Sequence, residues 1–190
     1  MNINKLHKNH SITRGAWLPA IAGLTIVTAC IAFARTAQAN DDRAPEVPEQ
    51  IAVPVGNKVH FHGFAVGAQI YTWNGASWGS AVPDATLFDD DGNVVASHFA
   101  GPTWKSNSGS EVVGALPPLS VTVDPTAIPW LRLAAVEDRT HGPGILAGTT
   151  FIHRVNTAGG RAPSVNGTVI GQVARVPYIA DYFFYRQSND

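Results

Sequence analysis

The fold class is decided by the stretch Ala68-Gln69-Ile70-Tyr71-Thr72-Trp73, which Asn74-Gly75 follows directly. The stretch alternates in polarity and holds β-branched and aromatic side chains, a pattern typical of a half-buried β-strand. Asn-Gly after such a run predicts a hairpin, because a type I′ turn needs positive φ at both central residues. We therefore expect a tight turn at 74–75 and a returning strand that places Trp78 opposite residues 71–73.

Working outward from this hairpin, short strand-like stretches separated by turn residues continue along the chain. Further strands are expected at residues 58–62, 86–88, 94–99, 102–105, 111–113, 130–136, 149–155, 169–175 and 178–185. Only residues 128–139 carry a helical pattern. Many short strands at regular spacing predict an all-β, single-domain antiparallel β-sandwich or barrel with at most one short helix.

The first 39 residues have the features of a secretory signal peptide. Three basic residues, Lys5, Lys8 and Arg14, precede an uncharged apolar run over 16–34, and Ala37-Gln38-Ala39 supplies a small-residue cleavage site. We expect export to the periplasm or the extracellular space after cleavage near Ala39.

Two alternatives for the leader remain open. The apolar run over 16–34 is nearly long enough to span a bilayer, so an uncleaved membrane anchor is one of them. Val27-Thr28-Ala29-Cys30 also fits a lipoprotein-processing site with Cys30 as the lipidated residue.

The amino-acid composition and net charge exclude some classes of protein and of binding partner. Hydrophobic residues make up 45% of the chain and charged residues only 14%, which excludes a disordered polypeptide. Four of the 13 basic residues precede Asn40 and all 14 acidic residues follow it, so the mature chain carries a net charge of −5. We expect no nucleic-acid partner and, in the mature form, no membrane span. Residues 40–50 form an acidic, Pro-rich lead-in to a single domain over 51–190.

His60-Phe61-His62 is the candidate metal site. Residues two apart on a strand point to the same face, so two imidazoles could bind a transition metal, with His98 or His153 as a third ligand. This pattern supports an alternative function as a metal-dependent enzyme or metal carrier. The competing interpretation is a pair of half-exposed histidines on an edge strand.

Sequence motifs of serine hydrolases and nucleotide-binding enzymes lack the secondary structure that they require. Gly75-Ala76-Ser77-Trp78-Gly79 matches the G-x-S-x-G string of serine hydrolases, but no helix is expected after it, as a nucleophile elbow requires. No glycine-rich loop opens a helix either, so a nucleotide cofactor is not expected. The sequence therefore favours a protein that is not an enzyme and predicts no cofactor.

Six segments together resemble the DUF3455 family over nearly all of residues 51–186. They are Gly67–Tyr71, Pro83–Leu87, His98–Trp104, Ile128–Leu131, Arg154–Pro163 and Val176–Tyr185. The resemblance implies an exported protein of bacterial or fungal type and no defined activity. Members are often labelled malate dehydrogenase, a label that this sequence does not support because it has no dinucleotide-binding βαβ unit.

One departure from the family concerns cysteine. The resemblance implies that many relatives carry a Cys at the position of Trp73 and another near Ser164–Asn166, and hence a disulfide. Both are absent here. We expect any link between these two regions of the chain to be non-covalent.

The polar and aromatic residues within the family-like segments suggest a binding surface. We expect Gln69, Tyr71, His98 and Trp104 to bind a small ligand or an envelope or extracellular component. Besides the metal hypothesis, a structural or envelope-interaction protein without a small ligand stays open. The sequence fixes neither the ligand nor the oligomeric state.

Overall fold

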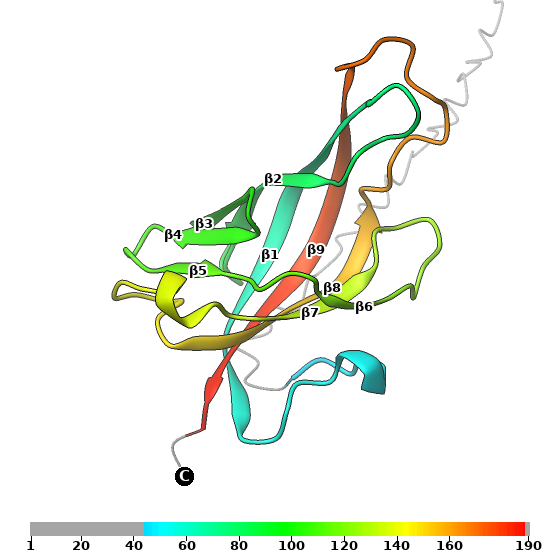
Figure 1. Cartoon of the computed structure of the whole chain (residues 1–190). Coiled ribbons are helices and arrows are strands. Elements are labelled where there is room, and N and C mark those ends of the chain that lie inside the picture. The colour runs from blue at the N-terminus through cyan, green and yellow to red at the C-terminus, as the bar shows by residue number, and fades with distance from the viewer. Residues whose placement is uncertain (1–43, 189–190) are drawn as a thin grey trace, which may run out of the picture. The chain divides into compact units, whose positions relative to one another are not determined.

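A computed structural model describes residues 44–188, which form one antiparallel sheet and two short 3-10 turns (Figure 1). The strands are β1 (Asn57–Thr72), β2 (Val82–Phe88), β3 (Val94–Phe99), β4 (Thr103–Ser106), β5 (Glu111–Val113), β6 (Leu119–Val121), β7 (Trp130–Ala134), β8 (Thr149–Gly159) and β9 (Val173–Gln187). The turns are η1 (Glu49–Ile51) and η2 (Glu137–Arg139). The all-β prediction is confirmed. The predicted signal peptide, membrane anchor and Cys30 lie outside the described residues.

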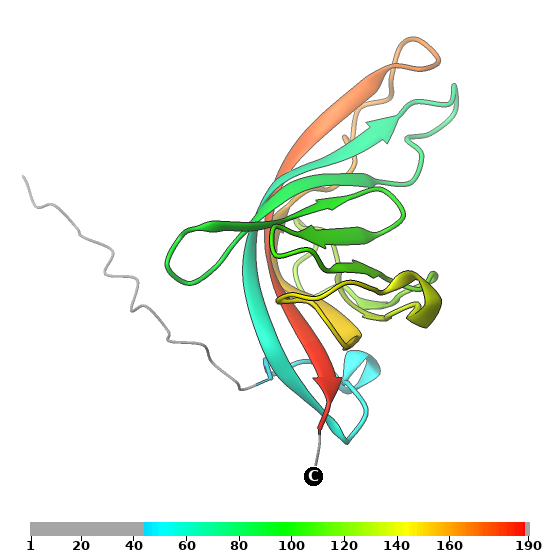
Figure 2. The same cartoon turned by 90° about the vertical axis from the view of Figure 1, so that its left-hand side faces the viewer.

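The strand order is β5-β4-β3-β2-β1-β9-β8-β7-β6, with the two longest strands, β1 and β9, paired at the centre. Figure 2 shows both strands bending along their length. Gly67 lets β2 pack closely on β1 at this point, because a Cβ there would overlap the backbone of Asp84 and Ala85 on β2.

The bend brings the β5 end of the sheet back against β7. Ala115 N–H donates to the Ala134 carbonyl (2.7 Å), and Val136 N–H donates to the Val113 carbonyl (2.8 Å). The architecture within residues 44–188 is therefore a single sheet curled into a half-barrel, which settles the sandwich-or-barrel alternative in favour of the curled sheet.

The concave inner face of the curled sheet holds the main core. Residues directly opposite each other in the register share a face, so Ala65 on β1 and Leu87 on β2 belong to the same layer. Both are fully buried. They pack in one cluster with Trp104, Leu133, Ile152 and Phe184 from four other strands.

The first predicted turn is confirmed in place but not in type. Trp73 and Trp78 form a bridge, and their rings lie 5.5 Å apart in an edge-to-face arrangement. Only Gly75 has positive φ (99°), so the connection is a longer loop and not a type I′ turn. The Asn74 side chain explains this, because its Oδ1 accepts hydrogen bonds from the N–H groups of Ala76 and Ser77.

The hairpins over 86–99 and 102–113 are confirmed, whereas three other expectations need correction. Of the strands expected at 169–175 and 178–185, residues 173–185 form one strand, β9, because Pro177 stays in the ladder opposite Ala68, whereas residues 169–172 lie in the preceding loop. Residues 128–139 do not form an α-helix, since β7 (Trp130–Ala134) pairs with β8 and only the last three residues form the 3-10 turn η2. Strand β6 is three residues long and was missed because so short a stretch shows no periodicity.

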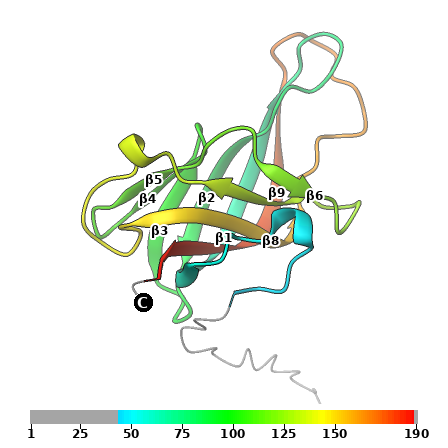
Figure 3. The same ribbon diagram turned by 60° about the horizontal axis from the view of Figure 1, so that its bottom comes forward.

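The end of the lead-in packs against the domain. Ile51, in η1, is fully buried, and its carbonyl accepts a 2.6 Å hydrogen bond from His153 Nε2. The other ring nitrogen, Nδ1, then accepts from the Tyr185 hydroxyl at 3.0 Å. Figure 3 shows η1 beside β6 and near β8. These contacts close the outer face of the sheet at this end.

The link between β1 and the 160–172 loop is non-covalent. A Cβ on Gly167 would lie 2.5 Å from Trp73 Cγ, so only glycine lets the loop pack this closely on the indole. The Trp78 indole N–H donates to the Val165 carbonyl at 3.0 Å. Residues 44–188 contain no cysteine, so ring packing and hydrogen bonds hold these segments together.

Candidate ligand-binding cavity

The inner face of the curled sheet forms a cavity of about 320 Å³ that is open to solvent on one side. Strands β1, β2, β3, β4, β7, β8 and β9 each contribute to its wall. Most of the wall is apolar and includes Val82, Pro83, Pro102, Leu116, Leu131 and Leu133. Leu131 and Leu133 are buried, whereas Leu116 is 69% exposed and marks the mouth. A cavity of this size and lining is typical of small-molecule sites.

Two buried hydrogen-bond donors in this wall have no partner. Gln69 and Trp104 are 2% and 1% exposed. Among the described residues, neither Gln69 Nε2 nor Trp104 Nε1 finds a hydrogen-bond acceptor. An unsatisfied buried donor costs about 1–3 kcal/mol, and native proteins contain few of them. Two in one cavity wall are therefore an uncommon feature that calls for a functional explanation.

His98 lies against Trp104 and is neutral. The two rings stack at 4.2 Å with an interplanar angle of 5°. His98 Nδ1 donates to the Thr103 carbonyl at 2.9 Å, which leaves Nε2 as the unprotonated, hydrogen-bond-accepting nitrogen. Burial lowers the pKa of His98 to about 3. The ring therefore presents an acceptor and a flat apolar surface at neutral pH.

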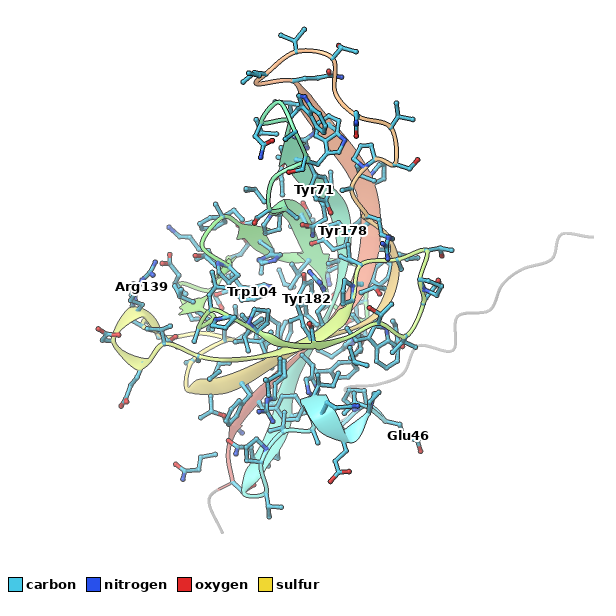
Figure 4. The ribbon with its side chains drawn as sticks, turned by 45° about the vertical axis from the view of Figure 1, so that its right-hand side comes forward. Glu46, Tyr71, Trp104, Arg139, Tyr178 and Tyr182 are labelled. Carbon is cyan, nitrogen blue, oxygen red and sulfur yellow. The ribbon has the colours of Figure 1, made fainter. Side chains whose placement is uncertain are left out.

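Tyrosines continue the inner face from β1 to β9. Figure 4 shows Tyr71, Tyr178 and Tyr182 one below another, with Trp104 beside Tyr182. The Tyr178 and Tyr182 hydroxyls lie 3.3 Å apart, and burial raises the pKa of both phenols, so they stay protonated. Tyr182 lines the cavity and meets Trp104 edge-on at 5.4 Å.

Among the described residues that line the cavity, the one charged residue is Arg154, on β8. Its Nε and Nη2 both donate to the Pro129 carbonyl, at 3.3 and 2.9 Å, and its guanidinium also contacts the Tyr182 hydroxyl. Within residues 44–188, ion pairs join His62 to Asp90 and Asp181, and Arg175 to Asp84, but none involves Arg154.

Of the four residues expected to bind a ligand, the structure brings Gln69, His98 and Trp104 together in the cavity wall. Tyr71 is two residues beyond Gln69 on the same strand face but does not line the cavity. Its hydroxyl instead donates to the Gly160 carbonyl at 2.6 Å. Sequence reasoning missed Arg154 as a wall residue, although it begins one of the family-like segments.

The predicted metal ligands His60 and His62 contact different parts of the molecule. A β-bulge between Val59 and Phe61 inserts His60 as an extra residue and breaks the two-residue alternation. His60 Nε2 lies 3.1 Å from Thr149 Oγ1, and burial lowers its pKa to about 4. His98 and His153, considered as third ligands, are buried and bonded elsewhere. The metal hypothesis stays a prediction.

His62 instead bridges two carboxylates on the outer face of the sheet. Its Nδ1 lies 3.0 Å from Asp90 and its Nε2 3.1 Å from Asp181. Burial opposes the charged ring, but hydrogen bonds to Asp181 and then Asp90 outweigh this and raise the pKa of His62. Asp181 also accepts a hydrogen bond from the Asn156 amide, at 2.9 Å.

Among residues 44–188, no group of three or more His, Cys, Asp or Glu side chains is arranged to hold a metal ion. No helix in that same range has the length and hydrophobicity needed to cross a bilayer.

Ser77 of the G-x-S-x-G string is exposed in the loop between β1 and β2, and the next regular element is a strand.

Fold and site together define a class: a curled antiparallel β-sheet protein with a largely apolar internal cavity that contains one arginine and unpaired donors. Residues 54–186 match the family described as "Protein of unknown function (DUF3455)", and the chain belongs to that family. Searches of the curated proteins and of the solved structures give no match.

Proposed function

We propose that the mature protein is an exported binding protein that holds a small ligand in the inner-face cavity. The ligand has an apolar body and at least one hydrogen-bond acceptor. Export is supported by the signal-peptide features of residues 1–39. The observation that carries the binding proposal is the pair of unpaired donors, Gln69 Nε2 and Trp104 Nε1, in one cavity wall.

The two unpaired donors lower the free energy of unfolding. Each buried donor without a partner lowers stability by about 1–3 kcal/mol, and an apolar residue of similar shape would remove that cost. Both nitrogens are closed to solvent, so we expect a ligand acceptor that enters the cavity to become the missing partner after a shift of the Gln69 or Trp104 side chain. The apolar side chains around the donors exclude water and strengthen such a hydrogen bond.

The stacked His98 and Trp104 rings give the site its shape. Their nearly parallel planes offer a rigid apolar surface, and flat or extended apolar groups pack well on such a surface. Tyr71 contributes indirectly, since its hydrogen bond to Gly160 holds the loop that packs against Gln69 and Tyr178.

The first test is binding to the full chain, measured by isothermal titration calorimetry. The probes are octanoate, octanamide, 4-propylbenzoate and 4-propylbenzamide, which combine alkyl or aryl bodies with charged or neutral heads. We expect at least one probe to bind. Ala100→Trp, which places an indole at an exposed position of the cavity lining, should abolish that binding. Ala76→Trp, in the exposed β1–β2 loop away from the cavity, is the matched control and should not.

The second test separates function from stability. Gln69→Met keeps the side-chain length and removes the unpaired amide, so we expect the free energy of unfolding to rise by about 1 kcal/mol while probe affinity falls. Gln187→Met, at the exposed end of β9, should change neither. If none of the four probes binds, or if Ala100→Trp leaves binding intact, the proposed function is wrong.

A further inference from the structure

Arg154 is a partly buried cation without a counter-ion in the described part of the chain. Arg175 is accommodated differently, since it pairs with Asp84 at 2.8 Å on the surface. Arg132, like Arg154, has neutral partners, the Phe151 ring at 5.5 Å and the Ala52 carbonyl, but it does not line the cavity. Arg154 has only neutral partners, the Pro129 carbonyl and the Tyr182 hydroxyl. A cation in an apolar environment is costly unless an anion accompanies it.

The other groups of the wall do not supply that anion. His98 is neutral, and Tyr182 stays protonated because burial raises its pKa. Gln69 and Trp104 carry no charge. Among residues 44–188, no Asp or Glu lines the cavity. The wall therefore has a net charge of +1 at neutral pH, in surroundings where charge interactions are stronger than in water.

The hydrogen-bonding groups point to the same ligand chemistry. Arg154, Gln69 and Trp104 supply donors, and two of these donors are unpaired. A carboxylate carries a negative charge and only accepts hydrogen bonds, so it complements both the charge and the donors. An amide or an alcohol of the same shape brings no charge to pair with Arg154.

We propose that the cavity takes an apolar monocarboxylate, whose carboxylate pairs with Arg154 and whose hydrocarbon body packs on the apolar wall. This inference rests on the proposed function and specifies the class of its ligand. Its carboxylate could belong to an alkyl or an aryl acid, and the two probe bodies distinguish these sources.

The experiment compares each acid with its amide on the full chain by calorimetry. A hydrogen-bonded charge pair at a site shielded from water predicts that the acid binds about tenfold or more tightly than the amide. Arg154→Met should remove this preference by weakening the acid alone, and Arg154→Lys should retain part of it. Arg175→Met, which removes a surface arginine that already has a partner, is the matched control and should leave both affinities unchanged.

The outcomes separate the two proposals. If acid and amide bind equally well, or if Arg154→Met weakens both to the same extent, the carboxylate inference is wrong while the cavity remains a binding site. If no probe binds at all, the proposed function fails and the inference fails with it. Should Arg154→Met not fold, the acid-to-amide ratio in the unmodified protein still decides, together with Arg154→Gln.

Discussion

His98 and His62 show how the two faces of one sheet treat the same residue type. His98 lies opposite Ala85, which lies opposite Gly67, and so belongs to the inner face. His62 is five residues before Gly67 on β1, which places it on the outer face. The inner ring is neutral with one backbone partner, whereas the outer ring bridges two carboxylates and favours the charged form.

The difference lies in how completely the polar groups are paired. On the outer face, His62, Asp90, Asp181 and Asn156 satisfy one another and need no ligand. On the inner face, two donors and a cation lack partners or counter-ions among the described residues. Polar groups that serve only stability are paired within the protein, so the unpaired ones identify the face where a ligand is expected.

The largest expected effect is on the inner face. Trp104→Ala removes a fully buried indole that packs on His98, Tyr182 and Phe184, and should lower the free energy of unfolding by about 3–5 kcal/mol in urea titrations. Trp104→Phe keeps a ring without the unpaired N–H and should cost far less while still weakening probe binding. Equal losses in the two variants would contradict the role assigned to that N–H.

The next largest effect is a loss of stability in acid caused by His98. Because burial lowers its folded pKa to about 3, the unfolded chain takes up the proton first as the pH falls below about 6.5. His98 therefore contributes stability above pH 6.5 that is lost progressively toward pH 3.

His98→Asn tests this contribution. The variant keeps a donor for the Thr103 carbonyl but does not titrate, so unfolding curves at several pH values should show a shallower loss in acid than the unmodified protein. Carboxylate protonation affects both proteins and cancels in the comparison. Identical pH profiles would show that His98 is not held neutral.

On the outer face, we expect His62 to have a smaller effect on the pH dependence of stability, with the opposite sign to that of His98. The folded pKa of His62 is raised, so its pairs with Asp90 and Asp181 stabilise the fold below the unfolded pKa of about 6.5 and lose that effect as the pH rises through the folded value. His62→Asn should cost about 0.5–1 kcal/mol in mild acid and less in alkali. A cost that stays constant across this range would mean that the ring is not charged.

The smallest expected effect lies at the mouth of the cavity. Leu116→Asp changes an exposed side chain and should alter stability by less than about 0.5 kcal/mol. Probe affinity should still fall several-fold, because the mouth becomes polar and its negative charge repels a carboxylate. Calorimetry with octanoate and thermal unfolding measure the two quantities. Val55→Asp, an exposed position that is not part of the cavity lining, is the control.

Alternation in the sequence was sufficient to predict most of the sheet, because each strand buries one face. It failed at His60, where a single extra residue reverses the alternation and only the partner strand shows the shift. Gln69, His98 and Trp104 were found as polar or aromatic residues within family-like segments. Arg154 was missed as a wall residue because its place depends on the long-range pairing of β8, β9 and β1, which local patterns do not reveal.

Because Trp73 packs on Gly167 without a disulfide, the stability of this contact does not depend on redox conditions. Thiol reagents and changes of redox potential have no target in residues 44–188, so the join between β1 and the 160–172 loop is indifferent to the compartment in which the chain folds. Heat or denaturant is needed to separate β1 from the 160–172 loop. A melting temperature that is the same with and without dithiothreitol is the expected signature.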